Sequence, residues 1–256
     1  MTWTATSKRW AVGAVLTLFA LHLSMLSASA QQLPKSDTFQ TPGGKTVTIN
    51  HIKHASIHIQ YDGRNIYVDP CGQNVDPYVD VSVLPRADII LLTHEHSDHY
   101  DPHAVPQMYM PSTAVYSNAP VYNKVHRGLI MQNGDSIAFS NDITIWAVPA
   151  YNTTEGREKF HPKGRDNGYV LQIDGLRIYV AGDTENIPEM ADLKNIDIAF
   201  LPCNQPYTMT VDQLVSAANT IKPRVLFPYH YSDTPVNMIR MRLAGSGIDV
   251  RIRNYK

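Results

Sequence analysis

The sequence predicts an α/β fold in which two mixed β-sheets face each other and helices cover their outer sides. Short apolar runs bounded by turn residues, which are typical of strands, occur in both halves of the chain, and helical stretches follow them in each half. No segment has the composition of a linker between domains. We therefore expect one domain that extends from residue 47 to residue 256.

The first 30 residues have the organisation of a secretory signal peptide. Lys8 and Arg9 precede an apolar stretch from Trp10 to Leu26, and Ala28-Ser29-Ala30 provides the small residues of a cleavage site. An uncleaved membrane anchor is the alternative, because the apolar stretch is long for a signal peptide. We expect cleavage before Gln31 and a periplasmic or secreted protein that is free of the membrane after cleavage.

The next segment is predicted as a leader followed by the first strands. Residues 31–46 are rich in Pro, Gly, Ser and Thr and predict a flexible leader. From Val47 to Tyr61 apolar and polar residues alternate, which predicts strands. Asp62-Gly63 predicts a hairpin turn, and residues 65–68 are expected to form the strand that follows it. His54 and His58 lie four residues apart, so on a strand they would share a face. His54 could line a cleft or be a structural histidine.

The main functional signal is the motif Thr93-His94-Glu95-His96-Ser97-Asp98-His99. It follows the apolar run of residues 87–92, which predicts a strand buried on both faces. A tight loop there would hold His94 and His96 side by side and turn Asp98 and His99 towards a neighbouring point. Imidazole and carboxylate ligands suit zinc, and also manganese or iron. A polar turn with chance histidines is the alternative, but the density of histidine favours a metal site.

The later elements are predicted from turn and capping signals. They are a short helix from Asp101-Pro102, strands near residues 114–116, 136–139 and 143–148, a hairpin of residues 169–173 and 176–180, a capping box at 210–213 with a helix behind it, a strand at 224–227, and a helix from Thr234-Pro235 to Gly245. Residues 151–167 are polar and without periodicity, which predicts a flexible loop or an active-site lid.

The composition excludes some classes of partner. The formal net charge is −1, 18% of residues are charged, and no basic run occurs, so we expect no nucleic-acid partner. Cys71 and Cys203 both follow predicted strands. In an exported protein, we expect them to form a disulfide across the rim of the site.

The motif from His94 to His99 resembles the His-x-His-x-Asp-His signature of the metallo-β-lactamase superfamily. Other motifs of that family have counterparts, in the same order, at Asp69, Asp183 and His230. The resemblance extends from about residue 47 to the C-terminus. It is closest to the branch of ascorbate-6-phosphate lactonase-like hydrolases, on residues 160–164, 181–184 and 206–209, and it implies an αββα sandwich.

The resemblance implies a binuclear metal-dependent hydrolase that uses a metal-activated hydroxide on an ester, lactone, amide or phosphoester. Zinc is the expected divalent ion, and manganese or iron would also fit. The first ion would be bound by His94 and His96, and the second by Asp98, His99 and His230. Asp183 would bridge the two ions. Asp69 would accept a hydrogen bond from a ligand imidazole. Asp98 would also orient the hydroxide, as the catalytic residue.

Three of these residues have structural alternatives when each is taken alone. Asp183 could cap a helix, His230 could be a packed core histidine, and Asp69 could be a turn residue. All three occur in the same order, relative to the histidine motif, as in the family, and this favours the metal site over the structural alternatives.

One position departs from the commoner pattern of the family. Many members place a third histidine for the first ion directly after the strand that corresponds to residues 143–148, where this chain has Asn152. We predict that His161, in a Phe160-His161-Pro162-Lys163-Gly164 context resembling the lactonase-like branch, takes that role. If His161 were an ordinary loop histidine, the first ion would be weakly held and the site would be mononuclear.

The sequence says less about the substrate. Four cations on the loop of His161 favour an anionic substrate, unless they are simply solvated: Arg157, Lys159, Lys163 and Arg165. The predicted substrate-binding residues are Asn204, Tyr207 and Tyr231. A di-iron redox protein and a non-catalytic metal-binding protein of the same fold are the alternative functions.

Overall fold

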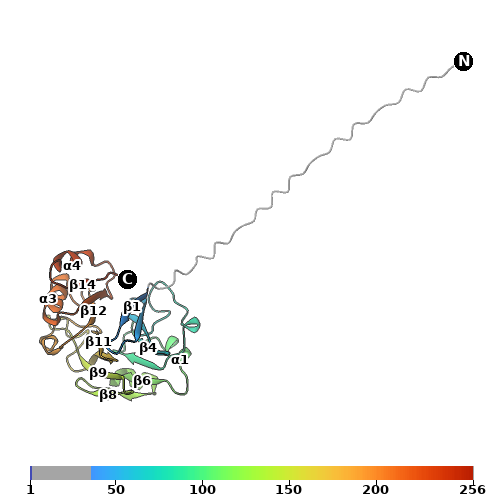
Figure 1. Cartoon of the computed structure of the whole chain (residues 1–256), viewed down its shortest axis with the longest axis horizontal. Coiled ribbons are helices and arrows are strands. Elements are labelled where there is room, and N and C mark those ends of the chain that lie inside the picture. Colours follow the sequence, from blue (N-terminus) through green and yellow to red (C-terminus); the bar gives the residue numbers. More distant parts are fainter. Residues whose placement is uncertain (2–35, 256) are drawn as a thin grey trace. The chain divides into compact units, whose positions relative to one another are not determined.

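The structure of the protein, a computed structural model, describes Met1 and residues 36–255. The predicted signal peptide and its cleavage site therefore lie outside the described residues, apart from Met1. Residues 36–255 contain two seven-stranded mixed sheets with short helices (Figure 1). The predicted two-sheet fold is confirmed.

The first sheet holds the strands of the N-terminal half in chain order. They are β1 (Ser36–Gln40), β2 (Thr46–Lys53), β3 (Ser56–Tyr61), β4 (Arg64–Val68), β5 (Ile89–Leu92), β6 (Ala114–Ser117) and β7 (Leu129–Ile130). The first four pair antiparallel, and β4 to β7 pair parallel.

The second sheet repeats this plan. Its strands are β8 (Ser136–Ala138), β9 (Ile143–Ala150), β10 (Asp166–Ile173), β11 (Leu176–Val180), β12 (Ile198–Pro202), β13 (Val225–Tyr229) and β14 (Asp249–Val250). Strands β8 to β11 pair antiparallel, and β11 to β14 pair parallel.

Short helices flank the two sheets. They are η1 (Val81–Val83), α1 (Ala104–Gln107), α2 (Ala119–Val125), η2 (Pro188–Asp192), α3 (Val211–Ile221) and α4 (Asn237–Arg242). Figure 1 shows α3 and α4 together on one side of the sheets and α1 on the other. No helix within residues 36–255 is long and apolar enough to span a membrane.

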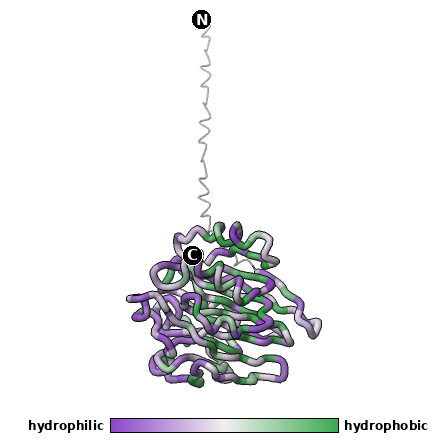
Figure 2. The backbone as a smooth tube through the Cα atoms, turned by 90° about the vertical axis from the view of Figure 1, so that its left-hand side faces the viewer, coloured by the Kyte–Doolittle hydropathy of each residue, from purple (hydrophilic) through white to green (hydrophobic). Residues whose placement is uncertain are grey.

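The core lies between the sheets, and a second apolar cluster lies under the N-terminal helices. Along β5, Ile89 and Leu91 belong to the inter-sheet core, whereas Ile90 and Leu92 belong to the cluster that α1 and α2 cover. Successive side chains of a strand point to opposite faces, so β5 is buried on both, as predicted. Figure 2 shows hydrophobic residues along the strands and many hydrophilic ones in the outer loops.

The helix α3 forms where the capping signal predicts it. The hydroxyl of Thr210 accepts the N–H of Gln213 at 3.1 Å, and Oε1 of Gln213 accepts the N–H of Thr210 at 2.8 Å. These two bonds satisfy backbone donors that the first helical turn leaves unpaired. The helix α4 starts at Asn237, slightly later than Thr234-Pro235 predicts.

The prediction of a flexible leader is wrong for residues 36–46, and residues 31–35 lie outside the described residues. Strand β1 pairs with β2 over five residue pairs. Asp37 is buried and accepts hydrogen bonds from Arg253 at 2.6 and 2.7 Å. Pairing and a charge-assisted contact with the C-terminal segment thus order a sequence of low apolar content.

Candidate metal centre

The carboxyl ends of parallel strands bring the predicted site residues to one edge of the fold. Asp69 directly follows β4, Thr93 and His94 follow β5, and Asp183 and His230 follow β11 and β13. Both Asp69 and His230 have positive φ, 45° and 48°, which turns the chain sharply at the strand end. Ends of parallel strands are where loops can gather functional side chains on a rigid base.

Three imidazole nitrogens meet at the first ion position. Nδ1 of His96 lies 3.0 Å from Nε2 of His94 and 3.2 Å from Nε2 of His161. Nitrogens that bind one tetrahedral zinc at roughly 2.0–2.1 Å lie ~3.4 Å apart. These three residues therefore form a group with the spacing of a metal site.

A second group lies at the other side of Asp183. Oδ2 of Asp98 is 3.3 Å from Nε2 of His230 and 3.9 Å from Nε2 of His99. Nε2 of His99 and His230 and Oδ1 of Asp183 are buried without a hydrogen-bond partner among the described residues. Buried polar atoms normally have a partner, so these orphaned atoms fit a bound cation.

Asp183 stands between the two groups. Its Oδ2 lies 4.0 Å from Nε2 of His94, 3.4 Å from Nε2 of His161 and 3.4 Å from Nε2 of His230. Its Oδ1 lies 3.2 Å from Nε2 of His99. One carboxylate thus reaches both groups, the position that a bridging ligand requires.

Asp69 fixes the tautomers of two candidate ligands. Its Oδ2 lies 2.8 Å from Nδ1 of His99 and accepts the hydroxyl of Thr93 at 2.7 Å. That hydroxyl in turn lies 3.0 Å from Nδ1 of His94. The carboxylate can only accept a hydrogen bond, so the ring proton of His99 is on Nδ1. The hydroxyl of Thr93 donates to Asp69 and therefore accepts from Nδ1 of His94, which carries the ring proton there too. The Nε2 atoms of both histidines are left for a metal.

His161 is held by the residue that replaces the family's usual histidine. Its Nδ1 lies 2.6 Å from Oδ1 of Asn152, whose Nδ2 donates to the carbonyl of Tyr207 at 2.8 Å. The amide oxygen can only accept, so Nε2 of His161 is left unprotonated beside His94 and His96. His161 is fully buried, which does not fit a surface loop histidine.

Burial and mutual charge set the protonation of these groups. Burial lowers the pKa of His161 to about 4 and that of His94 well below its ordinary value. Burial alone would raise the pKa of Asp183, but the imidazoles of His230 and His99 hold that pKa well below the usual range. Neutral His94 and His161 beside an ionised Asp183 have the protonation states that metal binding requires. The carboxylates of Asp183 and Asp98, in contrast, outweigh burial and raise the pKa of His99 well above its ordinary value, so a bound ion would displace a proton from His99.

The loop of residues 151–165 is ordered and covers the first position. Oε2 of the buried Glu185 accepts the N–H groups of Thr153 and Thr154 at 2.8 and 2.7 Å, and Asn152 N–H donates to the carbonyl of His161 at 2.9 Å. Of the two predictions for this segment, an active-site cover fits and a flexible loop does not.

His54 joins the site, although its sequence position gave no clear assignment. It lies in the turn between β2 and β3, with φ of 45°, and not on a strand. Its Nε2 is 3.2 Å from Oδ2 of Asp98. His58, on β3, stacks on Tyr67 away from the metal groups. The prediction that both histidines share a strand face is therefore wrong.

The predicted substrate-binding residues differ in position. The hydroxyl of Tyr231 donates to the carbonyl of Arg253 and accepts Tyr255 N–H at 3.3 Å, so Tyr231 anchors the C-terminal segment and the substrate prediction is not supported. Tyr207 is 44% exposed and stacks edge-on with Phe160 beside the loop of His161. Asn204 is partly exposed, and its N–H donates to Thr208.

Most of the loop cations are engaged within the protein. Arg165 donates to Asp166 at 2.8 Å, Lys163 donates to Glu189 at 2.9 Å, and Arg157 donates to Gln205. Lys159 lies over the ring of Phe160. These pairings weaken the prediction of an anionic substrate, because the charges already have partners.

Both cysteines are buried free thiols, so the predicted disulfide is wrong. The thiol of Cys71 donates to the carbonyl of Ser97 at 3.6 Å, and the hydroxyl of Thr234 donates to the carbonyl of Cys203. Both residues do follow strand ends, but there they pack into the protein.

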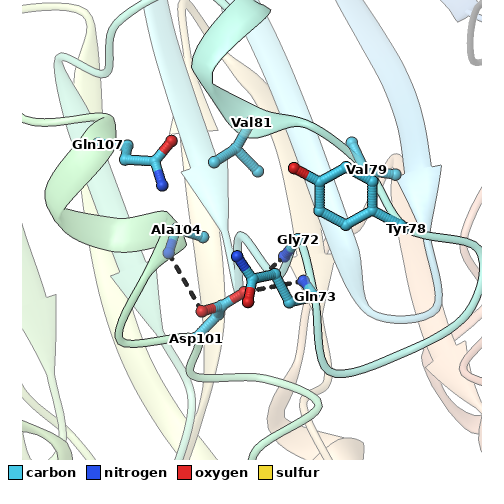
Figure 3. A pocket seen from close by; sticks show the side chains of 8 residues that line it. All are labelled: Gly72, Gln73, Tyr78, Val79, Val81, Asp101, Ala104 and Gln107. Atoms are coloured by element: carbon cyan, nitrogen blue, oxygen red, sulfur yellow. Dashed lines mark hydrogen bonds between the residues drawn. The ribbon is translucent and has the colours of Figure 1, made fainter.

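A small cavity of about 10 Å³ lies beside Asp101, apart from the metal groups (Figure 3). The carboxylate of Asp101 accepts the N–H groups of Gly72 and Gln73 at 2.9 and 3.0 Å and that of Ala104 at 3.1 Å. Since its charge is satisfied by the backbone and the cavity has room for one water at most, this place is structural.

Known proteins are similar to this chain in sequence and structure. Residues 48–230 match the profile of the Beta-lactamase superfamily domain. The UPF0173 metal-dependent hydrolase of Ligilactobacillus salivarius is 32% identical over 190 residues, which cover 71% of this chain and 84% of the relative. That of Nanoarchaeum equitans is 27% identical over 194 residues, covering 73% and 85%. A crystal structure from Parabacteroides distasonis, named as a metal-dependent hydrolase, has a TM-score of 0.83 and 51% identity, and covers 87% of this chain and 99% of that chain.

Proposed function

This chain belongs to the beta-lactamase superfamily and is a metal-dependent hydrolase, and we propose that it holds two divalent ions and cleaves an ester, lactone, amide or phosphoester bond of a small molecule. The relatives carry the name of hydrolases, which favours hydrolysis over di-iron redox chemistry or metal binding alone.

The observation that carries the proposal is the position of Asp183. Its carboxylate lies within 4.0 Å of a nitrogen from each of four histidines: His94, His99, His161 and His230. A single ion would need only part of this set, whereas two ions with a shared carboxylate use all of it. The nitrogen-rich set favours zinc, with manganese or iron as alternatives.

The chemistry follows from the burial of the ligands. Divalent ions held by these residues would supply a water molecule of lowered pKa and a positive charge that polarises a substrate oxygen. His94, His99 and Asp183 are almost fully buried and keep their geometry, whereas the side chain of Asp98 is 32% exposed. Asp98 is thus the carboxylate that can orient the attacking water and accept its proton on the substrate side.

We also propose that the protein acts in the periplasm or outside the cell, on a small-molecule substrate. The basic residues, the apolar stretch and the Ala28-Ser29-Ala30 site at the N-terminus support export. Tyr207, on the exposed rim beside Phe160, is the proposed substrate contact. Asn204, partly exposed nearby, is a second.

The test is a hydrolysis screen of lactones, β-lactams, phosphodiesters and thioesters on metal-loaded protein. Asp183→Ala and His230→Ala are expected to lower activity by orders of magnitude and to reduce the number of bound ions. His103→Ala changes an exposed histidine outside the metal groups and serves as the matched control. Turnover that survives chelation and both substitutions would contradict the proposal.

A further inference from the structure

A third histidine reaches the second ion position from the turn between β2 and β3. The side chain of His54 is 7% exposed, its Nε2 is 3.2 Å from Oδ2 of Asp98, and its ring centroid is 3.9 Å from that of His230. None of the roles assigned above uses this residue.

Backbone contacts fix the turn that carries His54. Its carbonyl accepts the N–H of His230 at 3.0 Å. Two residues on, the hydroxyl of Ser56 donates to the carbonyl of Asp69 at 2.6 Å and accepts the N–H of Cys71 at 3.0 Å. The turn is therefore joined to the ends of β13 and β4, the strands that carry His230 and Asp69.

We propose that His54 is a positioning residue whose Nε2–H donates to Oδ2 of Asp98 and holds this carboxylate towards His99 and His230. The inference rests on the proposed function. Asp98 lies on a tight loop with a partly exposed side chain, so without a donor its carboxylate can rotate into solvent. A hydrogen bond from a buried imidazole limits that rotation and keeps Oδ2 at the ion position.

The geometry favours this role over that of a further metal ligand. His54, Asp98 and His230 lie close enough to hold one ion. However, the carboxylate of Asp183 lies within 4.0 Å of His99 and His230 and has no such contact with His54. Asp98, His99, His230 and Asp183 already supply four ligand atoms, and a catalytic ion must also keep a position for water, so a fifth protein ligand is not needed. His54 contacts the carboxylate of Asp98 and packs against the ring of His230.

Substitutions matched to the backbone test the proposal. At φ of 45°, asparagine is well tolerated, so His54→Asn keeps the turn but is too short to reach Asp98. His54→Gln places an amide N–H near the former Nε2. His58→Ala is the control, because His58 is buried on the neighbouring strand and bonds Asn65 at 2.9 Å, outside the metal groups.

Stepwise zinc titration against a competing chelator is the measurement. We expect His54→Asn to weaken the second binding step by about 10–100-fold and to leave the first unchanged. His54→Gln should recover most of the loss, and His58→Ala should bind both ions as the unsubstituted protein does. Cobalt at saturation should give the same absorption bands in His54→Asn, because the ligand set is unchanged.

Other results overturn the inference. They are an unchanged second step in His54→Asn, equal losses in both steps, failure of His54→Gln to recover binding, or altered cobalt bands, which would make His54 a ligand. If His54→Asn does not fold, His54→Gly, which also accepts positive φ, replaces it. An unsubstituted protein that binds fewer than two ions refutes the proposed function, and this inference falls with it.

Discussion

Asp69→Asn is expected to weaken metal binding at the second position although Asp69 would touch no ion. In the protein, Oδ1 of Asp69 accepts Thr93 N–H at 2.8 Å, and Oδ2 faces both Thr93 Oγ1 and Nδ1 of His99. The asparagine oxygen must stay on Thr93 N–H, since a backbone donor cannot turn away. The amide NH₂ then faces His99.

This replacement changes the tautomer of His99. The hydroxyl of Thr93 can rotate to accept from the amide, but Nδ1–H of His99 would face another donor. The ring proton is then favoured on Nε2, the atom that should bind the metal. Loss of such a supporting contact costs about 10–100-fold in metal affinity, or about 1.4–2.8 kcal/mol.

Competition with a chromophoric chelator measures the affinity of each binding step. Asp88→Asn is the control, because the carboxylate of Asp88, one residue before β5, accepts the N–H of Asn65 at 2.8 Å, which an amide oxygen can also accept. We expect the second binding step to be weaker in Asp69→Asn than in the unsubstituted protein and to be unchanged in Asp88→Asn. Equal affinities for Asp69→Asn and the unsubstituted protein would refute the reasoning about the tautomer.

Three further predictions follow from other parts of the chain. His161→Ala should release about one ion and leave the second position occupied, because it removes one nitrogen of the first group; unchanged stoichiometry by elemental analysis would contradict this. Asp37→Asn should lower the free energy of unfolding by about 2 kcal/mol near pH 7. Burial alone would raise the pKa of Asp37, but the contacts with Arg253 and His51 outweigh this effect and lower that pKa from 3.8 to about 2. That contribution is present above about pH 4 and is lost as the pH falls through about 2, so the difference between the two proteins in denaturant melts should shrink on acidification. The exported protein should begin at Gln31, and N-terminal sequencing that finds Met1 intact in a membrane-bound chain would contradict export.

The sequence predicted best those elements whose signal is local. The apolar run before the histidine motif gave β5, and the capping box gave the start of α3. The helix α2 was missed, although Asn118 at its N-cap and a proline in its first turn were readable signals. Strand β1 was missed because its residue Asp37 is held by Arg253, which lies 216 positions later in the sequence, and local composition cannot reveal such a contact.

The site residues that follow predicted strands could be identified from the sequence. The site residue in a turn without glycine or proline, His54, could not. His54 and Ala55 form the turn between β2 and β3, and neither is the glycine or proline that would mark a turn in the sequence. Its contact with Asp98 spans 44 positions and depends on the pairing of the whole sheet. Asn152 was identified as a departure from the family pattern, but its hydrogen bond to His161 needed the folded loop.

The central claim is that two ions share Asp183, and anomalous diffraction from crystals of the metal-loaded protein tests it most directly. We predict two peaks about 4 Å apart, one bound by His94, His96 and His161 and the other by Asp98, His99 and His230, with Asp183 between them. A single peak, or two peaks with His161 directed into solvent, would contradict the account.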